Sequence, residues 1–124
     1  MTKKLILCSI FVIGLLVGIA AQTRVSAQDE PMVGNYREIS VKSKEAKNTA
    51  AFAVKTRSAK TGKYITLVKI TKAEQQVVAG MNYRVCMLVR EGRRKAYAVT
   101  AVVYLNIKNK RTLSKWKNGG CTDL

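Results

Sequence analysis

The sequence predicts an α+β domain in which one helix lies across an antiparallel sheet of four or five strands. Small and apolar residues recur at three- and four-residue spacing over residues 46–57, which is the period of one narrow helical face. Three longer runs are rich in β-branched and aromatic residues, as strands are: residues 64–78, 81–89 and 96–107. One face of such a sheet needs a cover. Since only one helix is available, we expect that helix to lie across the sheet.

The helix has its own start and stop signals. Ser43 is a favoured N-cap residue, so we expect the first helical turn to follow it directly. The apolar positions run out near Arg57 or Ser58, where we expect the helix to end before a turn at residues 61–63. Alanines on the inner face permit close approach to the sheet, and Phe52 at the edge of that face supplies bulk.

The remaining elements follow from shorter patterns. Residues 36–41 predict either a short first strand or the lead-in to the helix. Polar turns are expected at residues 91–94 and 106–111. Residues 112–116 then predict a short last strand, which completes an antiparallel meander.

The first 27 residues have the pattern of a secretory signal peptide. A basic start precedes an apolar run over residues 5–21, and Val25 and Ala27 match the small-residue preferences of signal peptidase. We expect cleavage after Ala27, which leaves residues 28–124 as one secreted domain, or a periplasmic one in a bacterium. The alternative is an uncleaved anchor, because the apolar run is near the short limit for spanning a bilayer. After cleavage, no transmembrane segment is expected to remain.

The expected mature chain is strongly basic. Cleavage would remove three of the 23 lysines and arginines and none of the seven acidic residues, which leaves a formal net charge of +13. Such a charge steers a protein toward an acidic protein, an anionic membrane, a polysaccharide or nucleic acid. We expect no specific nucleic-acid partner. We interpret the basic clusters at residues 90–95 and 108–117 as a solvated face rather than a dedicated polyanion site.

Two cysteines, Cys86 and Cys121, remain after the expected cleavage. Export to an oxidising compartment favours a disulfide, and two cysteines allow only one intramolecular pairing. The bond would close a loop of about 35 residues and stabilise the fold by roughly 2–4 kcal/mol. Because the chain has no histidine, two thiolates are too few for a structural zinc site, and we expect no metal.

The sequence lacks the residues that common catalytic sites need. Without histidine, neither a Ser-His-Asp nor a Cys-His arrangement can be built. The seven acidic residues are spread over arms, turns and strand ends, which argues against a paired-carboxylate site. Neither a phosphate-binding glycine loop nor a calcium loop is present, so we expect no cofactor. The sequence therefore predicts a binding protein and not an enzyme.

A short segment between the first two long strands predicts a hairpin tip that can enter a cleft. It reads Gln76-Val77-Val78-Ala79-Gly80, an apolar pair followed by a small residue and a glycine. Gly80 can take positive φ and Ala79 adds almost no bulk, so the tip would be narrow. From these five residues alone, the alternative is an ordinary turn with both valines in the strand core.

Together with other segments, this tip resembles the cystatins, which are protein inhibitors of papain-like cysteine proteases. Residues 76–80 match the Gln-x-Val-x-Gly signature of that family, and residues 31–34 resemble its glycine-ended N-terminal segment. Residues 49–54 are similar to the Leu-Ala-x-Phe-Ala-Val helical run of plant and animal members. Residues 94–97 and 112–115, followed by a late cysteine, look like the closing strands of secreted cystatins. The resemblance covers nearly the whole expected mature chain and implies a cystatin-like fold.

The resemblance also implies a mechanism, which is reversible tight binding that occludes the active-site cleft of the protease. An N-terminal arm would occupy the non-primed subsites through Met32 and Val33, and Gly34 would let it turn away from the cleft wall. The hairpin tip would sit beside the catalytic residues, and Ile107 would supply an apolar contact from the second hairpin. The expected protease-binding residues are Met32, Val33, Gly34, Gln76, Val77, Val78, Ala79, Gly80 and Ile107.

The chain departs from the cystatin pattern at two places. Cystatins usually carry a Pro-Trp pair in the second hairpin, whereas residues 106–109 contain neither, and Trp116 lies in the last strand. In many secreted animal cystatins a cysteine lies where this chain has Ala98, so the pairing of Cys86 with Cys121 is inferred from count and compartment only. The lost Pro-Trp pair and the high charge support an alternative function. In that alternative, a non-inhibitory cystatin-fold protein binds anionic surfaces or polyanions.

Overall fold

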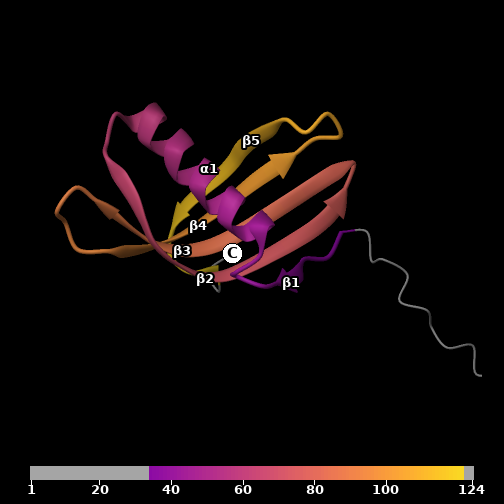
Figure 1. The fold of residues 1–124 in the computed structure, drawn as a ribbon, viewed down its shortest axis with the longest axis horizontal. Helices are drawn as coiled ribbons and strands as arrows, with labels where there is room; N and C mark the ends of the chain where they lie inside the picture. Colours follow the sequence, from indigo (N-terminus) through magenta and orange to yellow (C-terminus); the bar gives the residue numbers. More distant parts are fainter. Residues whose placement is uncertain (1–33, 122–124) are drawn as a thin grey trace, which may run out of the picture.

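The computed structural model describes residues 34–121, which form one helix and one five-stranded sheet (Figure 1). The expected signal peptide at residues 1–27 and the arm residues Met32 and Val33 lie outside this range. The elements in chain order are β1 (Arg37–Ile39), α1 (Lys44–Thr61), β2 (Ile65–Val78), β3 (Gly80–Glu91), β4 (Tyr97–Leu105) and β5 (Arg111–Asn118).

The sheet is an antiparallel meander with the strand order β1-β2-β3-β4-β5. The predicted α+β class is confirmed, and the sheet has five strands rather than four. The segment before the helix is a strand, because Arg37–Ile39 pairs with residues 73–75 of β2. The last strand is longer than predicted and runs from Arg111 to Asn118, paired along β4.

Helix α1 lies diagonally across one face of the sheet (Figure 1). Its N-cap is Ser43, as predicted, and the Ser43 hydroxyl accepts a hydrogen bond from the Ala46 amide. The predicted end near Arg57 or Ser58 is wrong, because the helix continues to Thr61. It stops where Gly62 takes a left-handed conformation and donates its amide to the Ser58 carbonyl. Apolar periodicity could not locate this end, since the last turn faces solvent.

The core lies between the helix and the sheet. The alanines Ala46, Ala50 and Ala53 have no exposed surface, which lets the helix backbone approach the strands closely. Phe52 is half-buried and packs against this core, as expected. The sheet residues that face the helix and are buried include Ala73, Val85, Met87, Val89, Val99, Ala101 and Val103.

The C-terminal segment crosses the face of the sheet opposite to the helix. Beyond β5, the Gly119 amide donates to the Ala98 carbonyl, and the Gly119 carbonyl accepts from the Thr100 hydroxyl. This path brings Cys121 to Cys86 in β3, with 5.6 Å between their Cα atoms, and the two form the expected disulfide. Cys86 is consequently only 4% exposed. Within residues 34–121, no helix is long and apolar enough to cross a membrane.

Candidate functional site

Three segments that are distant in sequence meet at one end of the sheet. They are the tip between β2 and β3, the turn between β4 and β5, and the chain that leads into β1 (Figure 1). We call this the tip end. The opposite end carries the turn between β3 and β4 and the C-terminus of the helix, and we call it the basic end.

The first tip is a tight reversal centred on Ala79. Val78 pairs directly with Gly80, and Gly80 has a φ of 109°. A Cβ atom at this glycine would overlap the Leu105 carbonyl oxygen and would lie 3.1 Å from a ring carbon of Tyr104. Glycine is therefore required at position 80 for two reasons: its backbone conformation and its close packing against the end of β4.

The first tip is also joined to the second hairpin by a hydrogen bond. The Tyr104 hydroxyl, which comes from β4, donates to the carbonyl of Ala79 at the apex of the tip. Together with the packing of Gly80 on Leu105, this contact fixes the position of one hairpin relative to the other. The sequence patterns did not reveal this role of Tyr104.

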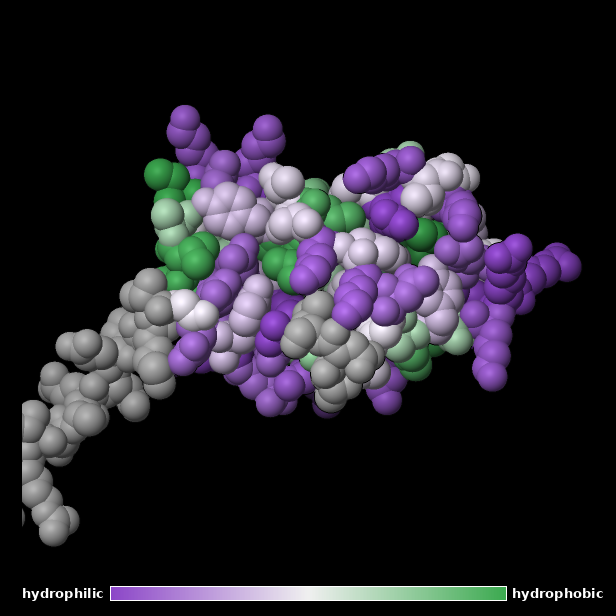
Figure 2. Space-filling view, turned by 180° about the vertical axis from the view of Figure 1, so that it is seen from behind, coloured by the Kyte–Doolittle hydropathy of each residue, from purple (hydrophilic) through white to green (hydrophobic). Residues whose placement is uncertain are grey.

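Apolar side chains at the first tip are presented to solvent. Val77 is 42% exposed, Val78 is half-buried and Ala79 is exposed. The alternative in which both valines belong to the strand core therefore does not describe Val77. Figure 2 shows the molecule from behind, and hydrophobic surface gathers at its left end, where the tips lie.

The second turn, between β4 and β5, is organised by Asn106. Its side-chain oxygen accepts hydrogen bonds from the amides of Lys108 and Lys110, both at 2.9 Å. Asn109 completes the turn with a φ of 62°, a conformation that asparagine tolerates. Ile107 lies at the apex and is 82% exposed. Trp116, by contrast, lies in β5 and packs against the helix-covered core.

The chain that leads into β1 is held by the first hairpin. The amide nitrogen of the Gln76 side chain donates to the Gly34 carbonyl at 2.7 Å. The side-chain oxygen of Gln76 accepts a hydrogen bond from the side-chain nitrogen of Asn82 at 2.8 Å. Gly34 has a φ of 114°, which a residue with a side chain adopts only with strain.

Two register positions further from the tip, a second cross-strand pair contacts the same segment. The Arg84 guanidinium lies 3.8 Å from the ring centroid of Tyr36 and forms an ion pair with Glu74. Lys72 approaches the other carboxylate oxygen of Glu74 at 3.3 Å. The hydrogen bond from Arg84 is the largest cause that lowers the pKa of Glu74 below its ordinary value. This carboxylate is nearly buried, with 7% of the residue exposed.

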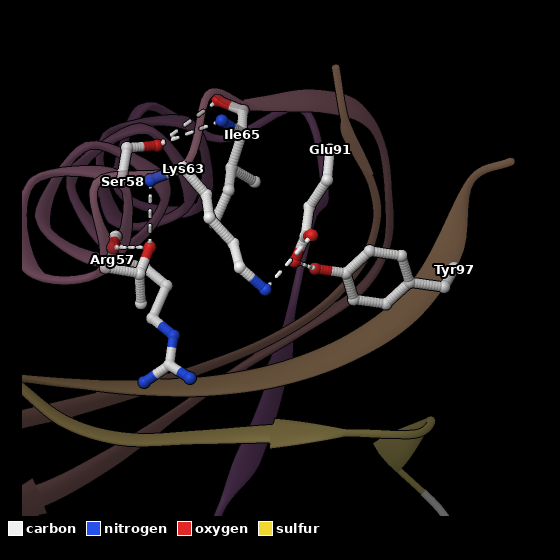
Figure 3. A network of polar contacts seen from close by, with 7 residues as sticks. Arg57, Ser58, Lys63, Ile65, Glu91 and Tyr97 are labelled. Carbon is white, nitrogen blue, oxygen red and sulfur yellow. Dashed lines mark hydrogen bonds and ion pairs between the residues drawn. The ribbon is translucent and has the colours of Figure 1, made fainter. Parts of the chain in front are cut away.

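The basic end has a different kind of polar network (Figure 3). Glu91 accepts a hydrogen bond from the Tyr97 hydroxyl at 2.8 Å and forms an ion pair with Lys63 at 3.4 Å. Burial, and then the hydrogen bond to Glu91, raises the pKa of Tyr97 to about 12. Ser58, in the last turns of α1, accepts from the Ile65 amide at 3.2 Å and so ties the helix to the start of β2.

Beyond this network, the turn between β3 and β4 exposes a basic surface. Its exposed cationic side chains are Arg93, Arg94 and Lys95 in the turn and Arg90 near the end of β3. Within residues 34–121, no group of three or more Cys, Asp or Glu residues could hold a metal ion.

Fold and tip end together define a class of protein. A helix across a five-stranded antiparallel sheet is the cystatin-like fold, as comparison with solved structures shows. The salivary cystatin of the soft tick Ornithodoros moubata superposes with a TM-score of 0.61 at 20% identity, covering 69% of this chain and 97% of the other. Mialostatin, a gut cystatin of the hard tick Ixodes ricinus, gives a TM-score of 0.61 at 16% identity, covering 69% and 98%.

Sequence comparison establishes the family. The model of the cystatin domain matches residues 34–118. Cystatin-1 of Ornithodoros moubata is 33% identical over 97 residues, which are 77% of this chain and 69% of that protein. This chain therefore belongs to the cystatin family. Members of that family are protease inhibitors rather than enzymes, and they generally bind papain-like cysteine proteases.

Proposed function

We propose that this protein is a reversible, tight-binding inhibitor of papain-like cysteine proteases, and that its N-terminal arm and two tips fill the active-site cleft as one wedge. Membership of the cystatin family indicates a cysteine protease inhibitor. The single observation that supports the wedge is the direct contact between the two hairpins, through Gly80 against Leu105 and Tyr104 with Ala79.

The geometry of the tips accounts for inhibition by occlusion. Val77 and Ile107 are exposed apolar side chains on two rigidly joined turns, so they can be buried in a cleft with little loss of conformational freedom. No peptide bond of the inhibitor need reach the catalytic cysteine in attack geometry. We therefore expect the inhibitor to be released uncut and active.

The arm and the two tips would contribute unequally to the affinity for the protease. Ile107 offers less apolar area than the tryptophan usual at this place in cystatins, so the second tip should contribute less affinity. In this proposal, more of the binding comes from the arm residues Met32, Val33 and Gly34 and from the tip of Gln76, Val77, Val78, Ala79 and Gly80.

A titration of papain tests the proposal. The mature protein, residues 28–124, is added to papain whose active sites have been counted, and residual activity is measured before and after dilution. We expect loss of activity at one inhibitor per enzyme and recovery of activity on dilution, with the inhibitor intact by mass spectrometry. Absence of inhibition at micromolar concentration would refute the proposal.

A second candidate function is polyanion binding, which the charge of the basic end favours. Arg93, Arg94 and Lys95 are exposed there, while the nearby carboxylate of Glu91 is occupied by Lys63 and Tyr97. Salt-sensitive binding to heparin by a protein that leaves papain active would support this function in place of inhibition. The triple variant Arg93→Ser, Arg94→Ser and Lys95→Ser should then lose heparin binding, whereas Lys108→Ser with Lys110→Ser at the other end should not.

We also propose that the protein acts outside the cell. The disulfide between Cys86 and Cys121 needs an oxidising compartment, and a similar structure is that of a salivary cystatin. Expression of the full chain in eukaryotic cells tests this. We expect the medium to contain a protein that begins at Gln28, and retention of the uncleaved chain in membranes would contradict the proposal.

A further inference from the structure

We propose that Gln76 and Arg84 are positioning residues that hold residues 34–36, the root of the N-terminal arm, in place beside the first tip before the protease binds. This inference rests on the proposed function. It gives the Gln76 side chain a role within the inhibitor, instead of a direct contact with the protease.

The geometry of the Gln76 amide supports this role. Both ends of the amide are occupied inside the molecule, since the nitrogen donates to Gly34 and the oxygen accepts from Asn82. The bond to Gly34 joins residues that are 42 positions apart in the chain. Because Asn82 pairs with Gln76 across β2 and β3, the sheet fixes the orientation of the amide before any protease is bound.

A second pair holds the arm root two residues further along. Glu74 pairs with Arg84 in the sheet register, and Arg84 stacks on the ring of Tyr36. Gly34 and Tyr36 are therefore fastened by successive cross-strand pairs on the face of the sheet away from the helix. Because the segment is held at two points, Gly34 and Tyr36, it cannot rotate about either contact alone.

The position of residues 34–36 matters because this segment lies beside the first tip. β1 pairs with β2 over Arg37–Ile39, so residues 34–36, which precede β1, lie outside the regular sheet pairing. The side-chain attachments at Gly34 and Tyr36 help to order this segment before the complex forms, which reduces the conformational entropy lost on binding. Because of these contacts, part of the conformational entropy of the segment is lost when the protein folds and not when the protease binds. The predicted effect of their loss is a faster release of the protease.

A double-mutant cycle separates positioning from direct contact. One change is Gln76→Ala, and the other is Met32→Ser with Val33→Ser, which removes the apolar side chains of the arm. If Gln76 acts through the arm, Gln76→Ala should raise Ki about tenfold with the intact arm and less than about twofold with the altered arm. An equal increase in both backgrounds would mean that Gln76 acts on the protease directly, and it would overturn the proposal.

Gln75→Ala is the matched control. Gln75 precedes Gln76 in β2, is also half-buried, and lies opposite Arg37 on the other face of the sheet. We expect its Ki to match that of the unaltered protein. Arg84→Met, which keeps most of the side-chain bulk but removes the charge, should repeat the arm-dependent pattern of Gln76→Ala more weakly. A thermal melt of each variant verifies that it is folded.

NMR relaxation of the free protein provides a readout that needs no protease. In the unaltered protein, we expect backbone order parameters of Gly34 and Tyr36 that are typical of rigid structure. In Gln76→Ala we expect them to fall toward about 0.6 or below, with no change in Gln75→Ala. Unchanged order parameters in Gln76→Ala would overturn the proposal. If papain is not inhibited at all, the proposed function fails, and this measurement alone decides whether the arm root is held.

Discussion

At the tip end, the turn of one hairpin packs against the next hairpin, whereas at the basic end the turn between β3 and β4 has open space around Gly92, whose amide donates to the Tyr64 carbonyl. A Cβ atom on Gly80 would overlap the backbone of β4, but one on Gly92 would meet nothing within 4 Å. Polar contacts at the tip end hold the backbone carbonyls of Ala79 and Gly34, and the apolar Val77 and Ile107 are exposed there, with Lys108 and Lys110 beside Ile107. At the basic end polar side chains bind one another (Figure 3), and Arg93, Arg94 and Lys95 are exposed to solvent.

Under the proposed function, this difference would let one sheet separate binding from stability. The contacts of the tip end set the relative positions of three segments, which is what a wedge needs. The contacts of the basic end tie the end of the helix and the start of β2 to the sheet. Changes at the tip end should therefore alter inhibition more than stability, and changes at the basic end should do the reverse.

The largest expected effect comes from Gly80→Ala. The new methyl group would clash with the Leu105 carbonyl and the residue would keep a positive φ, so the two hairpins must move apart. Strain at such a position costs about 1–3 kcal/mol, and the displaced tips should raise Ki for papain by about 100-fold or more.

Gly92→Ala is the control for this prediction. Gly92 also has a positive φ, 57°, but its surroundings are open. Alanine there costs about 1–2 kcal/mol of stability through its backbone conformation alone. We expect urea unfolding to show that loss while Ki stays unchanged. Equal Ki values for the Gly80 and Gly92 variants would abolish the proposed difference between the two ends.

The second prediction compares exposed apolar residues at the two ends. Ile107→Ala removes the apex of the second tip, and we expect Ki to rise about tenfold, equivalent to about 1.4 kcal/mol. Ile107→Trp should lower Ki, since a larger apolar surface would be buried.

Tyr64→Ala is the matched change at the basic end, where Tyr64 is 77% exposed. Its effect on Ki should fall within the error of the measurement. A rise in Ki for Tyr64→Ala as large as that for Ile107→Ala would show that the protease also contacts the basic end.

Local signals were enough to predict the order and type of the main elements and the tip, but not the end of the helix or the length of the last strand. Ser43 capped the helix, alternation in residues 81–89 identified β3, and the Gln-x-Val-x-Gly pattern placed a narrow turn before Met81. These features depend on residues that are neighbours in sequence. The cysteine count also sufficed to predict the disulfide, although the path of residues 119–121 across β4 could not be foreseen.

Long-range contacts of the site could not be read from local patterns. Gln76 carried a family signature, but its bond to Gly34 depends on β1 docking beside β2. The need for glycine at position 80 follows partly from Leu105, which only the packed sheet brings near. Asn106 is different, because an asparagine whose side chain bonds the amide two residues later is a recognised turn former, and that signal was available in the sequence.

The third prediction concerns Glu74, which forms an ion pair with Arg84, the residue that stacks on Tyr36. Its pKa is lowered, so its stabilising contribution is complete above the ordinary glutamate pKa of about 4.3 and is lost as pH falls through the lowered value. Glu74→Gln should cost about 1 kcal/mol at pH 7, and the difference from the unaltered protein should shrink below about pH 4.

Glu38→Gln is the control for the Glu74 prediction. Glu38 lies opposite Glu74 in the sheet register and is exposed, so its removal relieves a like-charge pair instead of an ion pair. We expect urea unfolding at pH 7 to show unchanged or slightly higher stability. A loss as large as that of Glu74→Gln would mean that the ion pair with Arg84 has no special role.

The smallest expected effect is that of Tyr97→Phe at the basic end. The pKa of the Tyr97 phenol is raised to about 12, so the folded state favours its neutral form. That contribution is complete below the ordinary tyrosine pKa of about 10 and is lost as pH rises toward 12. The variant should be slightly less stable than the unaltered protein at pH 8, by less than Glu74→Gln, and the two stabilities should converge above pH 10. Its Ki at pH 7 should be unchanged, because the bond to Glu91 fastens only the end away from the tips. A changed Ki with a preserved fold would show that the two ends are coupled through β3 and β4, and binding would then not be separable from stability in this sheet.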